Sequence, residues 1–395
     1  MVHIYPQRAC LDRLVEEMFK MVSYGADPKE WGQWLRIPLE HAAARGNLRL
    51  VDTLLGAGAD WSAGWKGCGG RTLLHAAALG SSEGVVSSLL RAGAQPDVNV
   101  ASTSSRRSAL YVAAKCGHED AARRLLLAGA DPNFEDPIDK GTALHEAADS
   151  GHEQLVRDLL AAGACLNARR GVKEGYTPLH LAASRGHLGT LSALLAFGAN
   201  KDALDNLGAL PIHHAISRDH VAATGRLLAA GADRTAGGSL KPLFLAAARG
   251  NVEILKAFFK HGVDVNFRDS VVGLTALHAA VSSTSSDGKA ATAATIHAFV
   301  DEGANVNIQR LDGGTPLHYA AAFASGSPSR DFVLALLQRG ASVNLAHNIT
   351  FQTPLHVACQ HQRPGVDVVV DLLLRWGADE KVVGGDGRTA LDLLE

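Results

Sequence analysis

The sequence predicts an all-α solenoid of about ten stacked helix-turn-helix units. A glycine, nearly always followed by alanine, closes an apolar run at eleven places: Gly25, Gly58, Gly93, Gly129, Gly163, Gly198, Gly231, Gly262, Gly303, Gly340 and Gly377. A second signal, threonine three residues before histidine, keeps the same phase at Thr142, Thr177, Thr275, Thr315 and Thr353. Two signals in one phase indicate a repeat, and a repeat array of 395 residues escapes the limit of roughly 250 to 300 residues on a single core.

Each repeated residue has a physical role in a two-helix unit. The threonine caps the first, inner helix, and a proline after it sits where its missing N–H is not needed. Paired alanines such as Ala182 and Ala183 let adjacent inner helices approach closely. A glycine turn follows, then a leucine-rich outer helix and the glycine that terminates it. We expect the inner helices to begin near Ile37, Thr72, Ser108, Thr142, Thr177, Leu210, Lys241, Thr275, Thr315 and Thr353.

The pattern from Thr177 to Ala182, Thr-Pro-Leu-His-x-Ala, resembles the signature of the ankyrin repeat family. The resemblance covers nearly the whole chain. It implies antiparallel helix pairs stacked in a curved superhelix, with β-hairpin loops, here called fingers, between successive repeats. We expect N-terminal capping helices in residues 1–36, about ten repeats in residues 37–387, and the start of a C-terminal capping repeat in residues 388–395.

Composition limits the partners and the setting. With 38 basic and 40 acidic residues, no global field draws the chain to nucleic acid or to an anionic membrane. Five scattered cysteines favour a reducing interior over a disulfide framework. No apolar run reaches the length of a membrane span. We therefore expect a monomer in the cytoplasm or nucleus that binds protein partners, without nucleic acid and without insertion into a membrane.

The fingers and the concave inner-helix face are the candidate binding surface, because the resemblance implies that ankyrin repeats bind there. Aromatic and basic residues gather on the early fingers, where no core position requires them. Tryptophan is a frequent anchor of protein interfaces, and an acidic or mixed partner segment would suit the cations. The candidate partner-binding residues are Trp61, Trp65, Arg106, Arg107, Phe134, Lys140, Arg169, Arg170, Lys173 and Tyr176.

Two departures from the repeat have alternative interpretations. Repeats eight to ten carry extra polar residues between their helices, at 282–291, 324–330 and 360–365, which we expect to be loops and which could form a second docking edge. Several fingers hold an asparagine after the Gly-Ala pair, as at Asn133 and Asn307. Asparagine suits tight turns, and in similar ankyrin repeats such a residue can be hydroxylated.

No motif predicts an enzyme, a metal site or a cofactor. Most of the eighteen histidines occupy the fourth signature position or the turn, so the repeat accounts for them. The glycine-rich residues 64–70 lack the Gly-Lys-Ser/Thr ending of a phosphate-binding loop. Adjacent His213 and His214 have no following cysteine, unlike the acyltransferases that carry ankyrin repeats.

These observations favour a non-enzymatic scaffold or adaptor. Two alternatives stay open. The chain could be the substrate-recognition subunit of a ubiquitin ligase whose box lies beyond residue 395, or the ankyrin region of a larger enzyme or channel.

Overall fold

The computed structural model describes residues 36–56, 71–94, 98–102, 106–234, 241–282, 291–322, 327–360 and 366–394, together with residues 17, 20, 21 and 24. The chain forms two compact units, Met1–Leu207 (unit 1) and Gly208–Glu395 (unit 2). Over these described ranges the regular elements are helical, and β pairing is limited to two isolated bridges, Arg170 with Tyr176 and Val383 with Thr389. The predicted all-α class is confirmed, and the fingers are turns closed by at most one such bridge in the described ranges.

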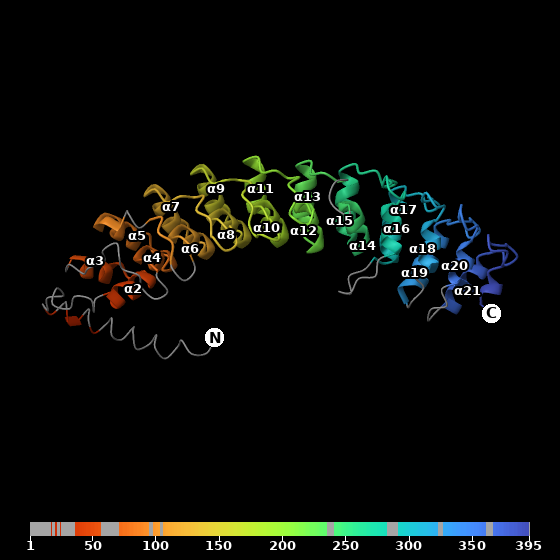
Figure 1. Ribbon diagram of the computed structural model, residues 1–395, viewed down its shortest axis with the longest axis horizontal. Coiled ribbons are helices and arrows are strands. Elements are labelled where there is room, and N and C mark those ends of the chain that lie inside the picture. Colours follow the sequence, from red (N-terminus) through yellow and green to blue (C-terminus); the bar gives the residue numbers. More distant parts are fainter. Residues whose placement is uncertain are drawn as a thin grey trace. The chain divides into compact units, whose positions relative to one another are not determined.

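Unit 1 has one layer of inner helices and one of outer helices, coloured red to yellow-green in Figure 1. The inner helices are α2 (Arg36–Ala44), α4 (Leu73–Leu79), α6 (Ala109–Cys116), α8 (Ala143–Ser150) and α10 (Pro178–Arg185). The outer helices are α3 (Leu48–Gly56), α5 (Glu83–Leu89) with the turn η2 (Leu90–Ala94), α7 (Glu119–Leu127), α9 (Glu153–Ala161) and α11 (Leu188–Ala196). Within unit 1, each helix packs against its partner in the repeat and against the equivalent helix of an adjoining repeat, as in a solenoid.

Unit 2 repeats the arrangement, in green to blue in Figure 1. Its inner helices are α12 (Pro211–Ser217), α14 (Pro242–Arg249), α16 (Ala276–Val281), α18 (Pro316–Ala322) and α20 (Pro354–Gln360). Its outer helices are α13 (Val221–Ala229), α15 (Val252–Lys260), α17 (Ala293–Asp301), α19 (Ser327–Gln338) and α21 (Val366–Arg375), and the short η4 (Leu391–Leu393) follows. The predicted inner-helix starts agree with the observed ones to within about one residue.

The signature threonine and histidine cap the inner helices and join each helix to the next finger. At the start of α8, the Thr142 N–H donates to Nδ1 of His145 at 3.1 Å. Nε2 of the same ring therefore carries the proton, and it donates to the carbonyls of Ala168 at 3.0 Å and Tyr176 at 3.2 Å. Burial lowers the pKa of His145 to about 4, so the ring is neutral near pH 7. His75, His278, His318 and His356 bond to the next finger in the same way.

Asparagine side chains form a second link between repeats. Asn133 donates from Nδ2 to the Gly163 carbonyl at 3.0 Å and accepts the Cys165 N–H at 2.6 Å. An amide side chain supplies a donor and an acceptor on separate atoms, so it can form both bonds at once. The same double bridge recurs at Asn99, Asn266, Asn307 and Asn344. These residues therefore do more than form turns, since each fixes the spacing between two repeats.

The prediction that residues 324–330 form a loop is wrong in part. α19 begins at Ser327, so the expected loop at 324–330 is helical from that residue onward. The sequence Ser-Pro-Ser suits a helix start, because proline is tolerated in the first turn. Most of the other two inserts, at 283–290 and 361–365, and most of the expected N-terminal cap lie outside the described residues.

Candidate protein-binding surface

Eight of the ten candidate binding residues lie on three fingers of unit 1, residues 98–107, 130–141 and 164–176. The other two, Trp61 and Trp65, lie outside the described residues. Arg106, Lys140, Arg169 and Lys173 are exposed, while the rest are half-buried: Arg107, Phe134, Arg170 and Tyr176. The fingers thus present exposed cations beside cationic and aromatic residues that are half-buried.

Arg107 is fixed from two sides. Its Nε lies 3.0 Å from a carboxylate oxygen of Asp136, which is almost fully buried. Its guanidinium carbon lies 4.8 Å from the ring centre of Tyr111, a distance typical of a cation–π contact. Burial opposes the charge, but the Asp136 hydrogen bond and the neighbouring Tyr111 and acidic groups outweigh it and raise the pKa of Arg107. The arginine therefore stays charged and holds one orientation on the finger.

Glu146 is the centre of a buried polar network that joins α6, α8 and the finger 164–176. Its side chain is only 6% exposed, accepts the hydroxyl of Tyr111 at 2.6 Å and pairs with Nη1 of Arg170 at 2.8 Å. Arg170 also pairs through Nε with Asp139 at 2.9 Å. Burial and the hydrogen bond to Glu146 raise the pKa of Tyr111, so its hydroxyl keeps its proton.

Asp139 completes the network on the neighbouring finger. Burial would raise its pKa, but the Gly141 N–H and the positive charge of Arg170 more than offset that effect and lower the pKa of the carboxyl group below its ordinary value. Two fingers are therefore joined by ionised groups. Because these side chains have little freedom left to lose, they are preorganised for contact with a partner.

Apolar side chains in the finger turns were not among the candidate binding residues. Ile138 is 69% exposed, and Val172 and Leu207 are each 76% exposed. All three belong to successive fingers of unit 1 and recur at steps of 34 and 35 residues. The signal was present in the sequence, because Ile138 stands in a short polar stretch where Pro137 is its only apolar neighbour. Unit 2 has the same feature at Val271, Leu311 and Ile349.

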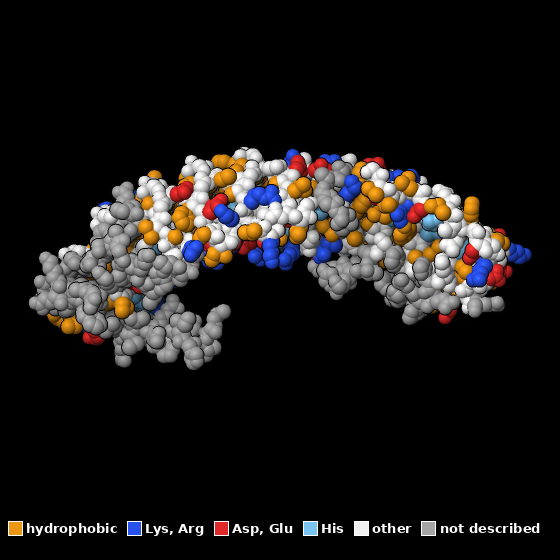
Figure 2. Space-filling model, in the orientation of Figure 1, with side chains coloured by type: hydrophobic (Ala, Val, Ile, Leu, Met, Phe, Trp, Pro, Cys, Tyr) orange, Lys and Arg blue, Asp and Glu red, His pale blue; other side chains and the backbone are white. Residues whose placement is uncertain are grey.

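The face drawn in Figure 2 does not carry charge of a single sign. Figure 2 shows lysine and arginine side chains interspersed with aspartate and glutamate, and apolar side chains between them. Mixed charge with exposed apolar groups is typical of protein interfaces. Recognition by such a surface depends on local groups rather than on net charge.

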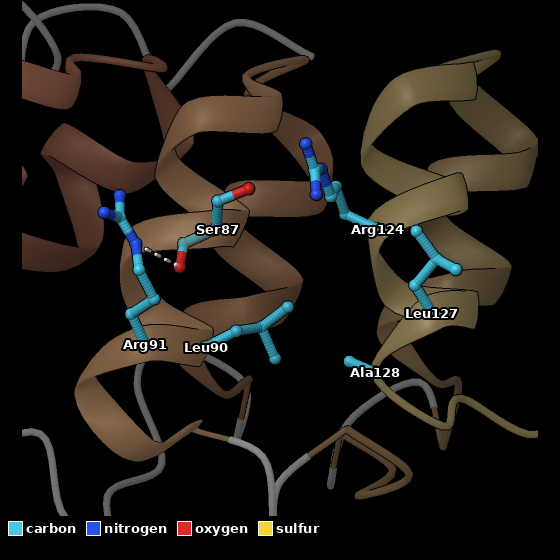
Figure 3. Close-up of a pocket in the computed structure, with 6 residues that line it drawn as sticks. All are labelled: Ser87, Leu90, Arg91, Arg124, Leu127 and Ala128. Carbon is cyan, nitrogen blue, oxygen red and sulfur yellow. Dashed lines mark hydrogen bonds between the residues drawn. The ribbon is translucent and has the colours of Figure 1, made fainter.

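The outer layer of unit 1 has a pocket between α5 and α7, with a volume of about 480 Å³ (Figure 3). Its lining residues are Ser87, Leu90, Arg91, Arg124, Leu127 and Ala128. Both arginines already have partners, since Arg124 pairs with Glu83 and Arg91 donates to the Ser87 carbonyl. The pocket lies on the outer helices, so it is separate from the fingers.

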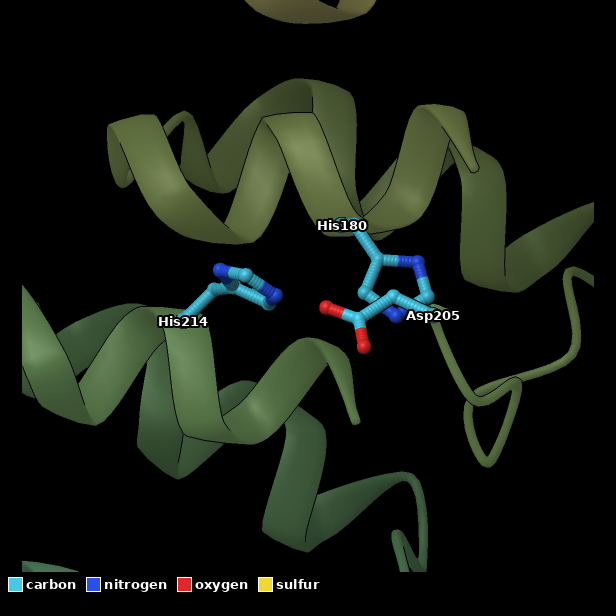
Figure 4. A group of neighbouring side chains, drawn as sticks. All are labelled: His180, Asp205 and His214. Carbon is cyan, nitrogen blue, oxygen red and sulfur yellow. The ribbon is translucent and has the colours of Figure 1, made fainter. Parts of the chain in front are cut away.

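His180 and Asp205 of unit 1 bring possible ligand atoms within 4.8 Å of one another. Figure 4 draws them with His214, which belongs to unit 2. Nδ1 of His180 is already engaged, because it lies 2.8 Å from the Thr177 hydroxyl and accepts the Thr177 N–H. The signature role of His180 is therefore sufficient to explain it.

No described helix has the combination of length and hydropathy that a membrane span requires. The longest one described, α19, has 12 residues, whereas a span takes about 20.

Comparison with known families agrees with the observed architecture. The family described as "Ankyrin repeats (3 copies)" matches residues 39–136, 144–237 and 288–383. The family described as "Ankyrin repeat" matches residues 239–267. These matches cover well over half of the chain and include the candidate binding residues except Lys140, which lies between two of the matched ranges.

Individual relatives are more distant. An ankyrin repeat protein of fowlpox virus (strain NVSL) is 33% identical over 127 residues, which is 31% of this chain and 34% of the relative. Ankyrin repeat and SOCS box protein 16 of Homo sapiens is 32% identical over 151 residues, or 38% and 30% of the two chains. A probable E3 ubiquitin-protein ligase of Oryza sativa subsp. japonica is 32% identical over 178 residues, or 43% and 33%. Each match spans only about a third of the relative's length.

The names of these relatives describe different kinds of protein. Ankyrin repeats are generally not catalytic, although the name of the rice relative describes an enzyme. The repeat signature, the two helix layers and the family matches agree with one another. This chain belongs to the ankyrin repeat family.

Proposed function

We propose that the chain is a non-enzymatic scaffold or adaptor that binds a protein partner through the fingers and the adjoining concave inner-helix face of unit 1. The observation that carries the proposal is the combination of fixed and exposed groups on successive fingers. Arg107 and Arg170 are held by buried carboxylates, and Ile138 and Val172 project beside them into solvent. In a complex, the exposed apolar side chains would be buried against the partner, and the oriented arginines would make specific polar contacts.

The experiment is quantitative affinity purification of the full chain from cells, with a Val172→Asp variant compared with wild type. Leu127→Asp is the matched control, because Leu127 is also 76% exposed but lies on the outer helix α7. We expect Val172→Asp to lose partners that Leu127→Asp retains. Loss with Leu127→Asp alone would move the binding surface to the outer layer and overturn the proposal.

A second candidate is the substrate-recognition subunit of a ubiquitin ligase. It is favoured by the similarity to a SOCS box protein and to a probable E3 ligase, each over about a third of the relative's length. Ubiquitin-ligase subunits among the purified proteins would support this candidate. Partners without them would favour the simple scaffold.

The sequence-based expectations about the setting stay predictions. Fluorescent tagging tests the cytoplasmic or nuclear location, and light scattering tests the monomer. A titration with labelled oligonucleotide tests the expected lack of nucleic-acid binding.

A further inference from the structure

One position in each described finger turn has a left-handed backbone. It lies three residues before the first residue of an inner helix, and its φ ranges from +52° to +88°. Glycine occupies it at Gly175, Gly208, Gly273 and Gly313. Three fingers instead have Arg106, Lys140 and Phe351. Because a Cβ disfavours this conformation, these three residues carry strain that glycine would avoid.

The neighbouring finger makes room for a side chain at this position. The carbonyl just before Lys140 accepts the N–H of Gly171 at 2.5 Å. The carbonyl just before Gly175 accepts instead the N–H of Asn206, and a Cβ on Gly175 would lie only 2.5 Å from Oδ1 of that asparagine. A side chain at residue 140 therefore faces a glycine, whereas a side chain at residue 175 would require the Asn206 side chain to shift.

The side chains of Arg106 and Lys140 contribute little to the fold that holds them. Each turn is closed by a main-chain bond, Arg106 N–H to the Ser102 carbonyl and Lys140 N–H to the Asp136 carbonyl, which glycine would keep. Lys140 pairs with Glu135 at 3.1 Å, but both side chains are at least half exposed, and such pairs add little stability. Strained residues without an internal role are typical of functional surfaces.

The cations continue along the edge of unit 1. Lys173 is exposed on the next finger and directly follows the exposed Val172, while Ile138 lies two residues before Lys140. Successive repeats pack about 8 to 10 Å apart. An extended segment rises about 3.1 to 3.3 Å per residue, so side chains three residues apart match that step.

We propose that Arg106, Lys140 and Lys173, with Ile138 and Val172 between them, form a basic strip that binds an acidic protein segment with interspersed apolar side chains. The inference rests on the proposed function and names the chemistry of its partner. Opposite charge favours carboxylates over the cations, and the apolar tips need apolar contacts that a phosphate backbone lacks. Glu135, beside Lys140 on the same strip, further disfavours a continuous polyanion such as nucleic acid.

The test begins with a random 12-residue peptide library selected on the immobilised full chain. We expect enrichment of Asp and Glu with apolar residues between them. The most enriched peptide, labelled with fluorescein, is then titrated with wild type and with the double variant Arg106→Gly, Lys140→Gly. We expect binding about tenfold weaker for the double variant at about 150 mM salt, together with a melting temperature equal to or above that of wild type.

Phe351→Gly is the matched control, because it relieves the same strain on unit 2 and leaves the strip intact. It should bind within about twofold of wild type and also keep or raise the melting temperature. Peptides without acidic enrichment, equal affinity for the double variant, or tighter binding of a dT20 oligonucleotide would each overturn the inference. The proposed scaffold function is decided separately by the Val172→Asp purification.

Discussion

The polar network around Glu146 gives a prediction that can be worked from distances. Glu146→Gln removes the charge that Arg170 meets at 2.8 Å and that Tyr111 meets at 2.6 Å. Losing a partner of a buried ion pair costs about 3 to 5 kcal/mol when the remaining charge has no other partner. Arg170 keeps Asp139 at 2.9 Å, and the glutamine oxygen still accepts one bond. We therefore expect a loss of about 2 kcal/mol, close to that of one charged hydrogen bond.

The assay is native-state hydrogen exchange on the full chain, because a repeat array opens locally. A loss of about 2 kcal/mol corresponds to roughly 30-fold faster exchange in α6, α8 and the finger 164–176. Glu153→Gln is the control, since Glu153 pairs with Arg157 at 2.8 Å with both side chains at least 40% exposed. Its effect should be about 0.5 kcal/mol or less. Equal exchange rates in the two variants would refute the assignment of Glu146 as the centre of the network.

Three further predictions concern the repeat itself. Burial lowers the pKa of His318 to about 4, against roughly 6.5 in the unfolded chain. The unfolded state therefore binds more protons between those values, and stability should fall with falling pH across that window by about 1.4 kcal/mol per pH unit for this residue. Urea unfolding at pH 7 and 4.5 measures the fall, and an unchanged pH dependence in His318→Gln would contradict it. Asn307→Asp removes the side-chain donor to the next repeat and should lower the free energy of unfolding by about 1 kcal/mol. Asn305→Asp keeps the oxygen that accepts the Asn307 N–H, so it should be nearly neutral. Equal losses of stability in chemical unfolding would argue against the asparagine bridges. Gly313→Ala should lower the melting temperature more than Gly129→Ala, because both backbones are left-handed but a Cβ at Gly313 overlaps the next finger while one at Gly129 meets nothing within 4 Å; equal shifts would count against close packing of the fingers.

Much of the fold could be predicted because its determinants are local and repeated. The sequence around Thr177 contains the cap, the proline and the histidine of one helix start, so it needs no distant partner to be interpreted. The same local logic located the other inner helices. It was less successful at Ser327, where an inserted polar stretch has both loop and helix-start residues and no periodicity to decide between them.

The candidate surface could be predicted only in outline. Arg107 and Arg170 were selected as finger cations, but their carboxylate partners lie 24 to 31 residues away in the sequence. Which side chains of successive repeats face one another depends on the stacking, which the sequence does not state. The exposure of Ile138 and Val172 depends on it as well, because an apolar residue in a turn can fold back onto its neighbours or project outward.

Binding of a protein through the fingers of unit 1 can be measured by hydrogen–deuterium exchange of the full chain with and without a purified partner. We expect slower exchange in residues 134–141 and 168–176 on complex formation, with the outer helices α7 and α9 unchanged. Protection confined to α7 and α9, with the fingers exchanging as they do in the free chain, would contradict it.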